Sequence, residues 1–261
     1  MNILTLLGFA FVILVFGMII TFTALGRKQG GFAFREIPAF VRLRRAVGLA
    51  VEAGARLQVN LGWGNPVSTE FASGLVGLTV LDRIARAASV SDNPPVATSG
   101  EGAHSILSQD TFRSAYGSLG IESQYDPTMG RLVGLTPFGY AAGVLPVIFD
   151  EQVSTNAAIG HLTEEVALIN DASMRKGNLT IAGSDSLPGQ AVIYATAEEP
   201  LIGEEVFAGG AYLGASPAHE ASLRSQDILR LILIALLLIS ALGKLFGIDQ
   251  LLLDLFPGLN P

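Results

Sequence analysis

Two long apolar runs lie near the ends of this chain and enclose a polar segment the size of a folded domain. The first, Ile3 to Leu25, carries no charge over 23 residues, and at about 1.5 Å per residue a helix of that length covers a hydrocarbon layer of about 30 Å. The second, Ile228 to Leu242, contains Arg230 near its start and is followed by Lys244, long cations that can reach lipid headgroups. Both runs are therefore predicted to span a membrane.

Charge is distributed unevenly along the chain. Between Gly26 and Arg56 seven residues are basic and two are acidic, which leaves nine basic and 21 acidic residues elsewhere. Lys and Arg beside a span mark its cytoplasmic end, and Met1 and Asn2 carry no side-chain cation. We therefore expect a two-span protein of the inner (plasma) membrane, with its amino terminus outside and its main domain in the cytoplasm. The acidic remainder would repel phosphates, so no nucleic-acid partner is expected.

A cleaved signal peptide is the competing interpretation of the first run. It would require basic residues before the apolar stretch and a small-x-small site after it, and the sequence has neither. The chain has no cysteine, which excludes disulfides, thiolate catalysis and zinc-thiolate sites and fits a reducing compartment.

These patterns divide the chain into five parts. They are a transmembrane helix at 1–26, a basic and aromatic juxtamembrane segment at 27–55, a cytoplasmic α/β domain at 56–215, a linker helix continuing into the second span at 216–247, and an outside tail at 248–261. Aromatic and basic side chains alternate in the juxtamembrane segment, which suits an anionic lipid surface and equally a helix docked on the domain. Both interpretations stay open. The basic residues expected to face lipid are Arg27, Lys28, Arg42, Arg44 and Arg45.

A short β-prone run, a turn and a helix-length stretch follow one another five times from Arg56 to Ala197. Parallel neighbours need crossover connections, and helices supply them. The pattern predicts a Rossmann-like α/β fold, a parallel sheet of about five strands with helices on both faces. Apolar positions from Leu201 to Tyr212 predict one further helix.

Small and polar residues mark the turn after each predicted strand. In an open parallel sheet such turns gather at the carboxyl edge, where ligands bind and backbone N–H groups can approach an anion. A strict G-x-G-x-x-G pattern is not met, because Val67 stands where its third glycine belongs. The candidate ligand-binding residues are Gly62, Asn65, Ser99, Gly160, Gly183 and Asp185.

No catalytic constellation stands out. The histidines are His104, His161 and His219, and His161 with Glu164 and Glu165 at helical spacing comes closest to a set of metal ligands. A third metal ligand is missing, and the two glutamates suit the first turn of a helix, where they complement its dipole. The sequence therefore predicts no catalytic residue, no metal and no cofactor. It favours a protein that is not an enzyme.

Several segments carry a family resemblance: STEFASGLVGLTVLDRIARAA, LTPFGYAAG, AVIYATAEE and LIGEEVFAGGAYLGASPAHEASLRSQDILRLILIALLL. From about residue 40 to residue 242 the chain resembles an uncharacterised family of membrane-anchored prokaryotic proteins with a domain of unknown function. The resemblance implies an anchoring helix at each end and an α/β domain between them. It implies no activity.

The leading hypothesis is a membrane-anchored structural or scaffold protein whose α/β domain self-assembles or docks on a membrane complex. It rests on small residues in both spans, which permit close helix packing, and on the lack of reactive side-chain groups. The alternative is a membrane-tethered domain, with or without enzymatic activity, that binds a nucleotide or other small molecule at the strand-end turns. A third hypothesis is lipid handling by the juxtamembrane segment.

Overall fold

The computed structural model describes residues 3–29 and 34–245. This part of the chain forms two compact units. One contains the two terminal helices and the other is an α/β unit, Phe34–Ser216. The predicted tail at 248–261 lies outside the described residues.

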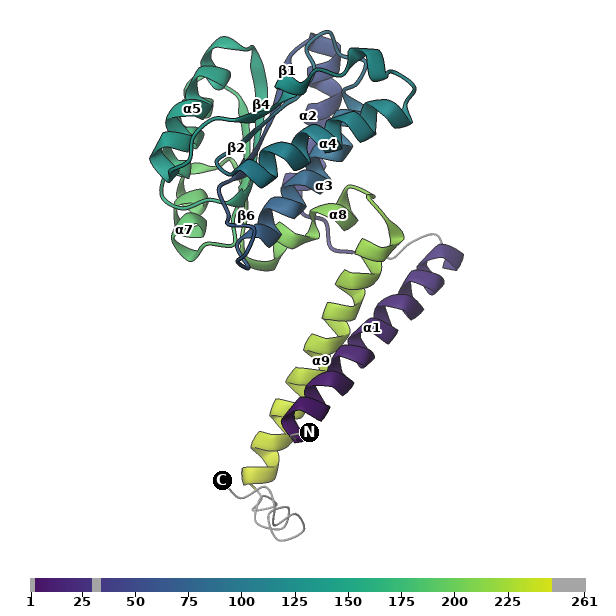
Figure 1. Ribbon diagram of the computed structural model, residues 1–261. Coiled ribbons are helices and arrows are strands. Elements are labelled where there is room, and N and C mark those ends of the chain that lie inside the picture. The colour runs from purple at the N-terminus through teal and green to yellow at the C-terminus, as the bar shows by residue number, and fades with distance from the viewer. Residues whose placement is uncertain (1–2, 30–33, 246–261) are drawn as a thin grey trace. The chain divides into compact units, whose positions relative to one another are not determined.

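The terminal unit consists of α1 (Ile3–Gln29) and α9 (Pro217–Leu245), which pack along one another (Figure 1). The hydroxyls of Thr21 and Thr23 donate to carbonyls one turn earlier, at 2.8 and 2.7 Å, so these polar groups are satisfied within their helix. Both helices are long and apolar enough to cross a membrane, and their apolar windows are exposed. The prediction of one candidate span near each end is confirmed.

The α/β unit contains one sheet of six parallel strands in the order β3-β2-β1-β4-β5-β6. This order is that of the doubly wound Rossmann fold, in which the chain changes direction across the sheet between β1 and β4. The strands are β1 (Arg56–Gly62), β2 (Val96–Ser99), β3 (Gly130–Leu132), β4 (Val153–His161), β5 (Leu179–Gly183) and β6 (Glu199–Leu201).

The sheet therefore has six strands and not five. The additional strand, β6, is only three residues long and contains Pro200, which cannot donate a ladder hydrogen bond. It pairs with β5 at the edge of the sheet, with Pro200 opposite Ala182. The helix expected from Leu201 to Tyr212 is instead the end of β6, a 3-10 helix (Gly203–Ala208) and the short α8 (Gly209–Tyr212).

Most helices begin where a side chain or a proline favours a first turn. Thr136 accepts a hydrogen bond from Gly139 N at 3.2 Å, and Ser186 one from Gly189 N at 3.4 Å. Pro38 opens the first helix of the unit, and Gly54 ends it in the left-handed conformation at φ 60°. The remaining helices are α2 (Pro38–Ala53), α3 (Phe71–Ala87), α4 (Gly102–Ser118), α5 (Pro137–Asp150), α6 (Val166–Arg175) and α7 (Leu187–Thr196), with 3-10 turns at Glu122–Gln124 and Pro127–Met129.

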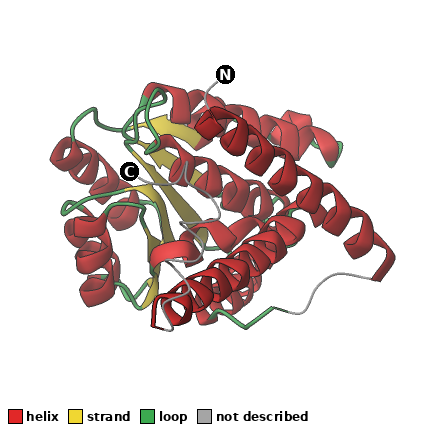
Figure 2. Ribbon diagram, turned by 90° about the horizontal axis from the view of Figure 1, so that it is seen from below, coloured by secondary structure: helices red, strands yellow, loops and turns green. Residues whose placement is uncertain are grey.

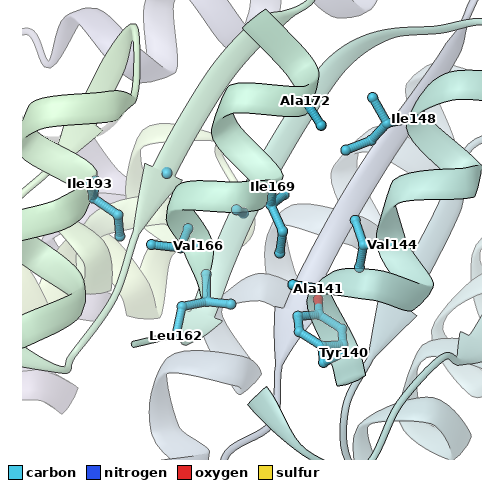
Figure 3. Packing of buried hydrophobic residues seen from close by; sticks show 11 residues of the cluster. Tyr140, Ala141, Val144, Ile148, Leu162, Val166, Ile169, Ala172 and Ile193 are labelled. Carbon is cyan, nitrogen blue, oxygen red and sulfur yellow. The ribbon is translucent and has the colours of Figure 1, made fainter. Parts of the chain in front are cut away.

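Helices cover both faces of the sheet (Figures 1 and 2). Helices α2, α3 and α4 pack with one another and with the strands on one face, whereas α5, α6 and α7 form the other layer. Figure 3 shows the core beneath the second layer, where Tyr140, Val144 and Ile148 of α5 meet Val166 and Ile169 of α6. The prediction of helices on both faces of a parallel sheet is confirmed.

The α/β unit begins at Phe34, upstream of the predicted boundary at residue 56. Helix α2 buries Phe40 and Leu43 and leaves its three arginines exposed. Phe40 stacks on Tyr212, with ring centroids 5.4 Å apart. The juxtamembrane segment thus includes a helix docked on the sheet, one of its two expected arrangements.

Candidate functional site

The strand order places the candidate site at the carboxyl ends of β1 and β4. In a doubly wound sheet the crossovers diverge at this point and leave room outside the strand ends. Gly62 ends β1, and His161 ends β4 opposite it. Around these two residues lie the side chains of Trp63, Tyr140, Glu165 and Asp185, which together with His161 we call the switch-point cluster.

Glu165 is the most deeply buried carboxylate of the cluster, with no exposed surface. One oxygen, Oε1, accepts from Trp63 Nε1 and from Thr163 N, both at 2.9 Å, and Oε2 accepts from the Thr163 hydroxyl. A buried carboxylate is stable only when its oxygens are hydrogen-bonded in this way. Glu165 therefore fixes the indole of Trp63 over the end of the sheet.

His161 and Asp185 form the second pair of the cluster. Asp185 Oδ1 lies 2.8 Å from His161 Nδ1, and the imidazole meets the Trp63 ring edge to face at 4.9 Å between centroids. The hydrogen bond to Asp185 raises the pKa of His161, burial opposes this, and the charges of Asp185, Glu70 and Glu165 add to the rise. The pair links the carboxyl ends of β4 and β5.

Tyr140 connects the cluster to the centre of the sheet. Its hydroxyl accepts from Gly62 N at 3.3 Å and lies 3.3 Å from the carbonyl oxygen of Thr98, to which it can donate. Complete burial raises the pKa of Tyr140, so the phenol stays neutral. Below it Asn60 accepts from Gln58 at 3.0 Å and from the Thr98 hydroxyl at 2.6 Å, and donates to Asn156.

The neighbouring helix amino ends contribute His104 and Glu101. His104 is buried and stacks on Phe71 at 4.2 Å between ring centroids, and burial lowers its pKa. Glu101 caps α4 by accepting from the backbone of His104 at 3.2 Å. His104 therefore acts as a packed aromatic ring, and its burial disfavours the charged form of the imidazole.

The predicted glycines pack against backbone and side chains. A Cβ at Gly62 would lie 2.1 Å from the His161 carbonyl oxygen, and one at Gly160 would lie 2.0 Å from that of Leu61. Gly62 also has φ +69°, a conformation that favours glycine. At Gly183 a Cβ would meet Leu201 at 2.9 Å. These glycines permit close approach of neighbouring elements.

The other predicted residues lie at the same edge in different surroundings. Asn65 is exposed and accepts from Val67 N at 2.9 Å within its own turn. Ser99 is buried at the end of β2 and donates to the Arg131 carbonyl at 3.3 Å. Of the six candidate residues, Gly62, Gly160 and Asp185 thus come together around His161.

Trp63 and Tyr140 were not predicted as site residues, and His161 and Glu165 were considered only as metal ligands and set aside. Each is brought to the cluster by a contact distant in sequence, such as the 102 residues between Trp63 and Glu165. One local signal existed, since Trp63 is the single tryptophan and directly follows a predicted strand.

The basic residues expected to face lipid differ in their surroundings. Arg42 pairs with Glu198 and Glu199, both at 2.7 Å, which ties α2 to the start of β6. Arg44 and Arg45 are exposed and form no ion pair in the described part of the chain. Arg27 is exposed on α1, and the side chain of Lys28 lies outside what the structure describes.

The electrostatics of the cluster disfavour an anionic ligand. Glu70, Glu165 and Asp185 all act on His161, so a phosphate entering here would approach three carboxylates. Among the described residues no three His, Asp or Glu side chains are grouped so as to hold a metal ion. What the arrangement provides is a His–Asp pair and a buried Trp–Glu pair that fix the strand ends.

The fold and site define a Rossmann-type α/β unit in a chain with a candidate membrane-spanning helix near each end. The chain belongs to the family described as Domain of unknown function (DUF6754), which it matches over residues 1–253. No curated protein and no solved structure matches the chain significantly.

Proposed function

We propose that this chain is a membrane-anchored scaffold protein whose α/β unit associates with a second copy through the carboxyl edge of its sheet. Helices α1 and α9 are the anchors, and the unit lies on the cytoplasmic side of a prokaryotic plasma membrane. The concentration of basic residues between Gly26 and Arg56 supports this orientation, and the resemblance described above supports an anchoring helix at each end.

The observation that carries the proposal is a set of exposed apolar side chains at that edge. Val67 is 94% exposed, Leu187 78%, Leu135 74% and Phe138 64%. They follow β1, β5 and β3, so all four belong to the carboxyl edge, and we call them the edge patch. Association through this edge would remove these apolar side chains from water, which favours association.

A second copy of this chain is the occupant of the edge patch that fits the observations best. Anchoring confines all copies to one plane with one orientation, which raises their effective concentration without any new contact. The anchors also leave small residues open, because a Cβ added at Gly8, Gly17 or Gly243 meets nothing within 4 Å. A membrane complex of other proteins is the competing occupant.

A nucleotide or other small anion has weaker support. The carboxylates of the switch-point cluster oppose an anion, and the space beside Gly62 and Gly160 is filled by the neighbouring strand.

Mass measurement of the full chain in lipid nanodiscs tests the proposal. The wild type should be a dimer or larger, and the double variant Phe138→Glu/Leu187→Glu should shift to monomer. Val90→Glu is the matched control, because Val90 is 79% exposed but lies in the turn before β2, at the opposite edge. A monomeric wild type, or a double variant that assembles like the wild type, would contradict the proposal. Co-isolation with a different protein in place of a second copy would favour the competing occupant.

A further inference from the structure

A cavity of about 350 Å³ lies between α2 and α3, away from the switch-point cluster. Its apolar wall is formed by Leu43 and Val47 of α2, Ile84 and Ala87 of α3, and Leu213 after α8. Its volume falls within the range of pockets that bind small molecules, about 300–1,000 Å³.

Three arginines line the same cavity, Arg44, Arg83 and Arg86. Arg86 is neutralised, since its side chain pairs with Asp82 at 2.8 Å and also donates to Ser118. Arg44 is exposed and makes no ion pair with any described residue. The cavity therefore keeps a positive charge from Arg44 and Arg83 that no described carboxylate balances.

Arg83 is held in place but only partly satisfied. One terminal nitrogen donates to the carbonyl of Gly214, whereas its Nε is buried and has no hydrogen-bond partner. The hydrogen bond to Gly214 fixes the Arg83 side chain next to Leu213, which also lines the cavity. The planar fork of an arginine matches the oxygens of a phosphate, with which it can form two parallel hydrogen bonds.

We propose that this cavity binds an amphiphilic anion bearing a phosphate group. The phosphate lies between Arg44 and Arg83, and its apolar substituent lies on Leu43, Val47, Ile84 and Leu213. Two sources share this chemistry, an anionic phospholipid and a soluble alkyl or aryl phosphate. The site is separate from the edge patch, so either proposal can fail without the other.

The test uses the full chain, delipidated in neutral detergent, and the shift of its thermal midpoint on addition of ligand. The probes are phosphatidic acid and hexyl phosphate, with diacylglycerol and hexanol as their phosphate-free counterparts. Only the phosphate-bearing probes should raise the midpoint. A response to phosphatidic acid alone identifies a lipid, whereas an equal response to hexyl phosphate identifies a soluble source.

Three variants locate the site. Arg44→Gln and Arg83→Gln should each weaken the apparent affinity about tenfold, the loss of one charge-assisted contact. Arg83→Lys, which keeps the charge without the fork, should recover only part of that loss. Arg113→Gln is the control, because Arg113 is exposed on α4 outside the cavity. Arg44 makes no described side-chain hydrogen bond, so Arg44→Gln keeps the test valid if Arg83→Gln fails to fold.

Two results would overturn the inference. One is a midpoint that the phosphate-bearing probes raise no more than their phosphate-free counterparts. The other is a loss of affinity in Arg113→Gln as large as that in Arg44→Gln, which would indicate attraction to the surface as a whole.

Discussion

The imidazole of His161 and the carboxylate of Asp185 face each other across the ends of β4 and β5, with Nδ1 and Oδ1 2.8 Å apart. The side chain of His161 is 10% exposed and that of Asp185 is 18% exposed. Because the hydrogen bond with Asp185 raises the pKa of His161, the pair makes stability depend on pH.

The sign of that dependence follows from the direction of the shift. A raised folded-state pKa adds stability that is fully present below the unfolded value of about 6.5 and is lost as pH rises through the folded value. In the wild type, this decrease in the free energy of unfolding is at most about 1.4 kcal/mol per pH unit, and we expect Asp185→Asn to abolish it. Thermal midpoints of the full chain in detergent between pH 5.5 and pH 8.5 measure it (the range spans about two units above the ordinary value).

Asp171→Asn is the control for this comparison, since Asp171 is exposed and pairs with Arg175 on α6. His104 contributes with the opposite sign, because burial lowers its pKa and stability falls as pH falls. The difference between wild type and Asp185→Asn isolates His161 from that background. An unchanged pH profile in Asp185→Asn would show that the pair has no energetic role.

Glu165→Ala should destabilise the α/β unit strongly. The substitution leaves Trp63 Nε1 and Thr163 N without their acceptor, and we expect a loss of about 2–4 kcal/mol. Glu164→Ala is the matched control, because Glu164 is adjacent but exposed, and it should change stability by less than about 0.5 kcal/mol. Trp63 is the single tryptophan, so its fluorescence during unfolding reports on this contact directly. Equal stabilities of the two variants would contradict the assignment.

Two glycine substitutions should have opposite effects. Gly160→Ala places a Cβ 2.0 Å from the Leu61 carbonyl oxygen, and we expect a loss of about 2–4 kcal/mol or a failure to fold. Gly48→Ala meets nothing within 4 Å inside α2 and should stabilise by about 0.5–1 kcal/mol. Denaturant unfolding of both variants checks the contrast. A tolerated Gly160→Ala would mean that β1 and β4 can move apart.

Local patterns predicted the repeating elements well, because each depends on its own residues. The repeat of strand, turn and helix was predicted from Arg56 to Ala197, and in the structure β1 begins at Arg56 and α7 ends at Thr196. The edge strand β6 was not predicted, because Glu199–Leu201 is only three residues long and its Glu and Pro have low strand propensity. Its pairing with β5 comes from the tertiary fold.

The site was harder to predict than the fold for a physical reason. Glu165 has the local appearance of a first-turn glutamate, and only the approach of Trp63 turns it into a buried hydrogen-bonded group. Gly160 looked like a turn residue that could admit a ligand, whereas in the sheet it admits the Leu61 carbonyl of β1. Such roles depend on which strands become neighbours, which a single sequence does not specify.

The most direct test of the account is the membrane topology of the full chain. The natural sequence has no cysteine, so single cysteines can be introduced at Asn2 and at the exposed Thr128 without a competing thiol. A membrane-impermeant maleimide applied to intact cells should label Asn2→Cys at once and Thr128→Cys only after lysis. Labelling of Thr128→Cys in intact cells would place the α/β unit outside and contradict the account.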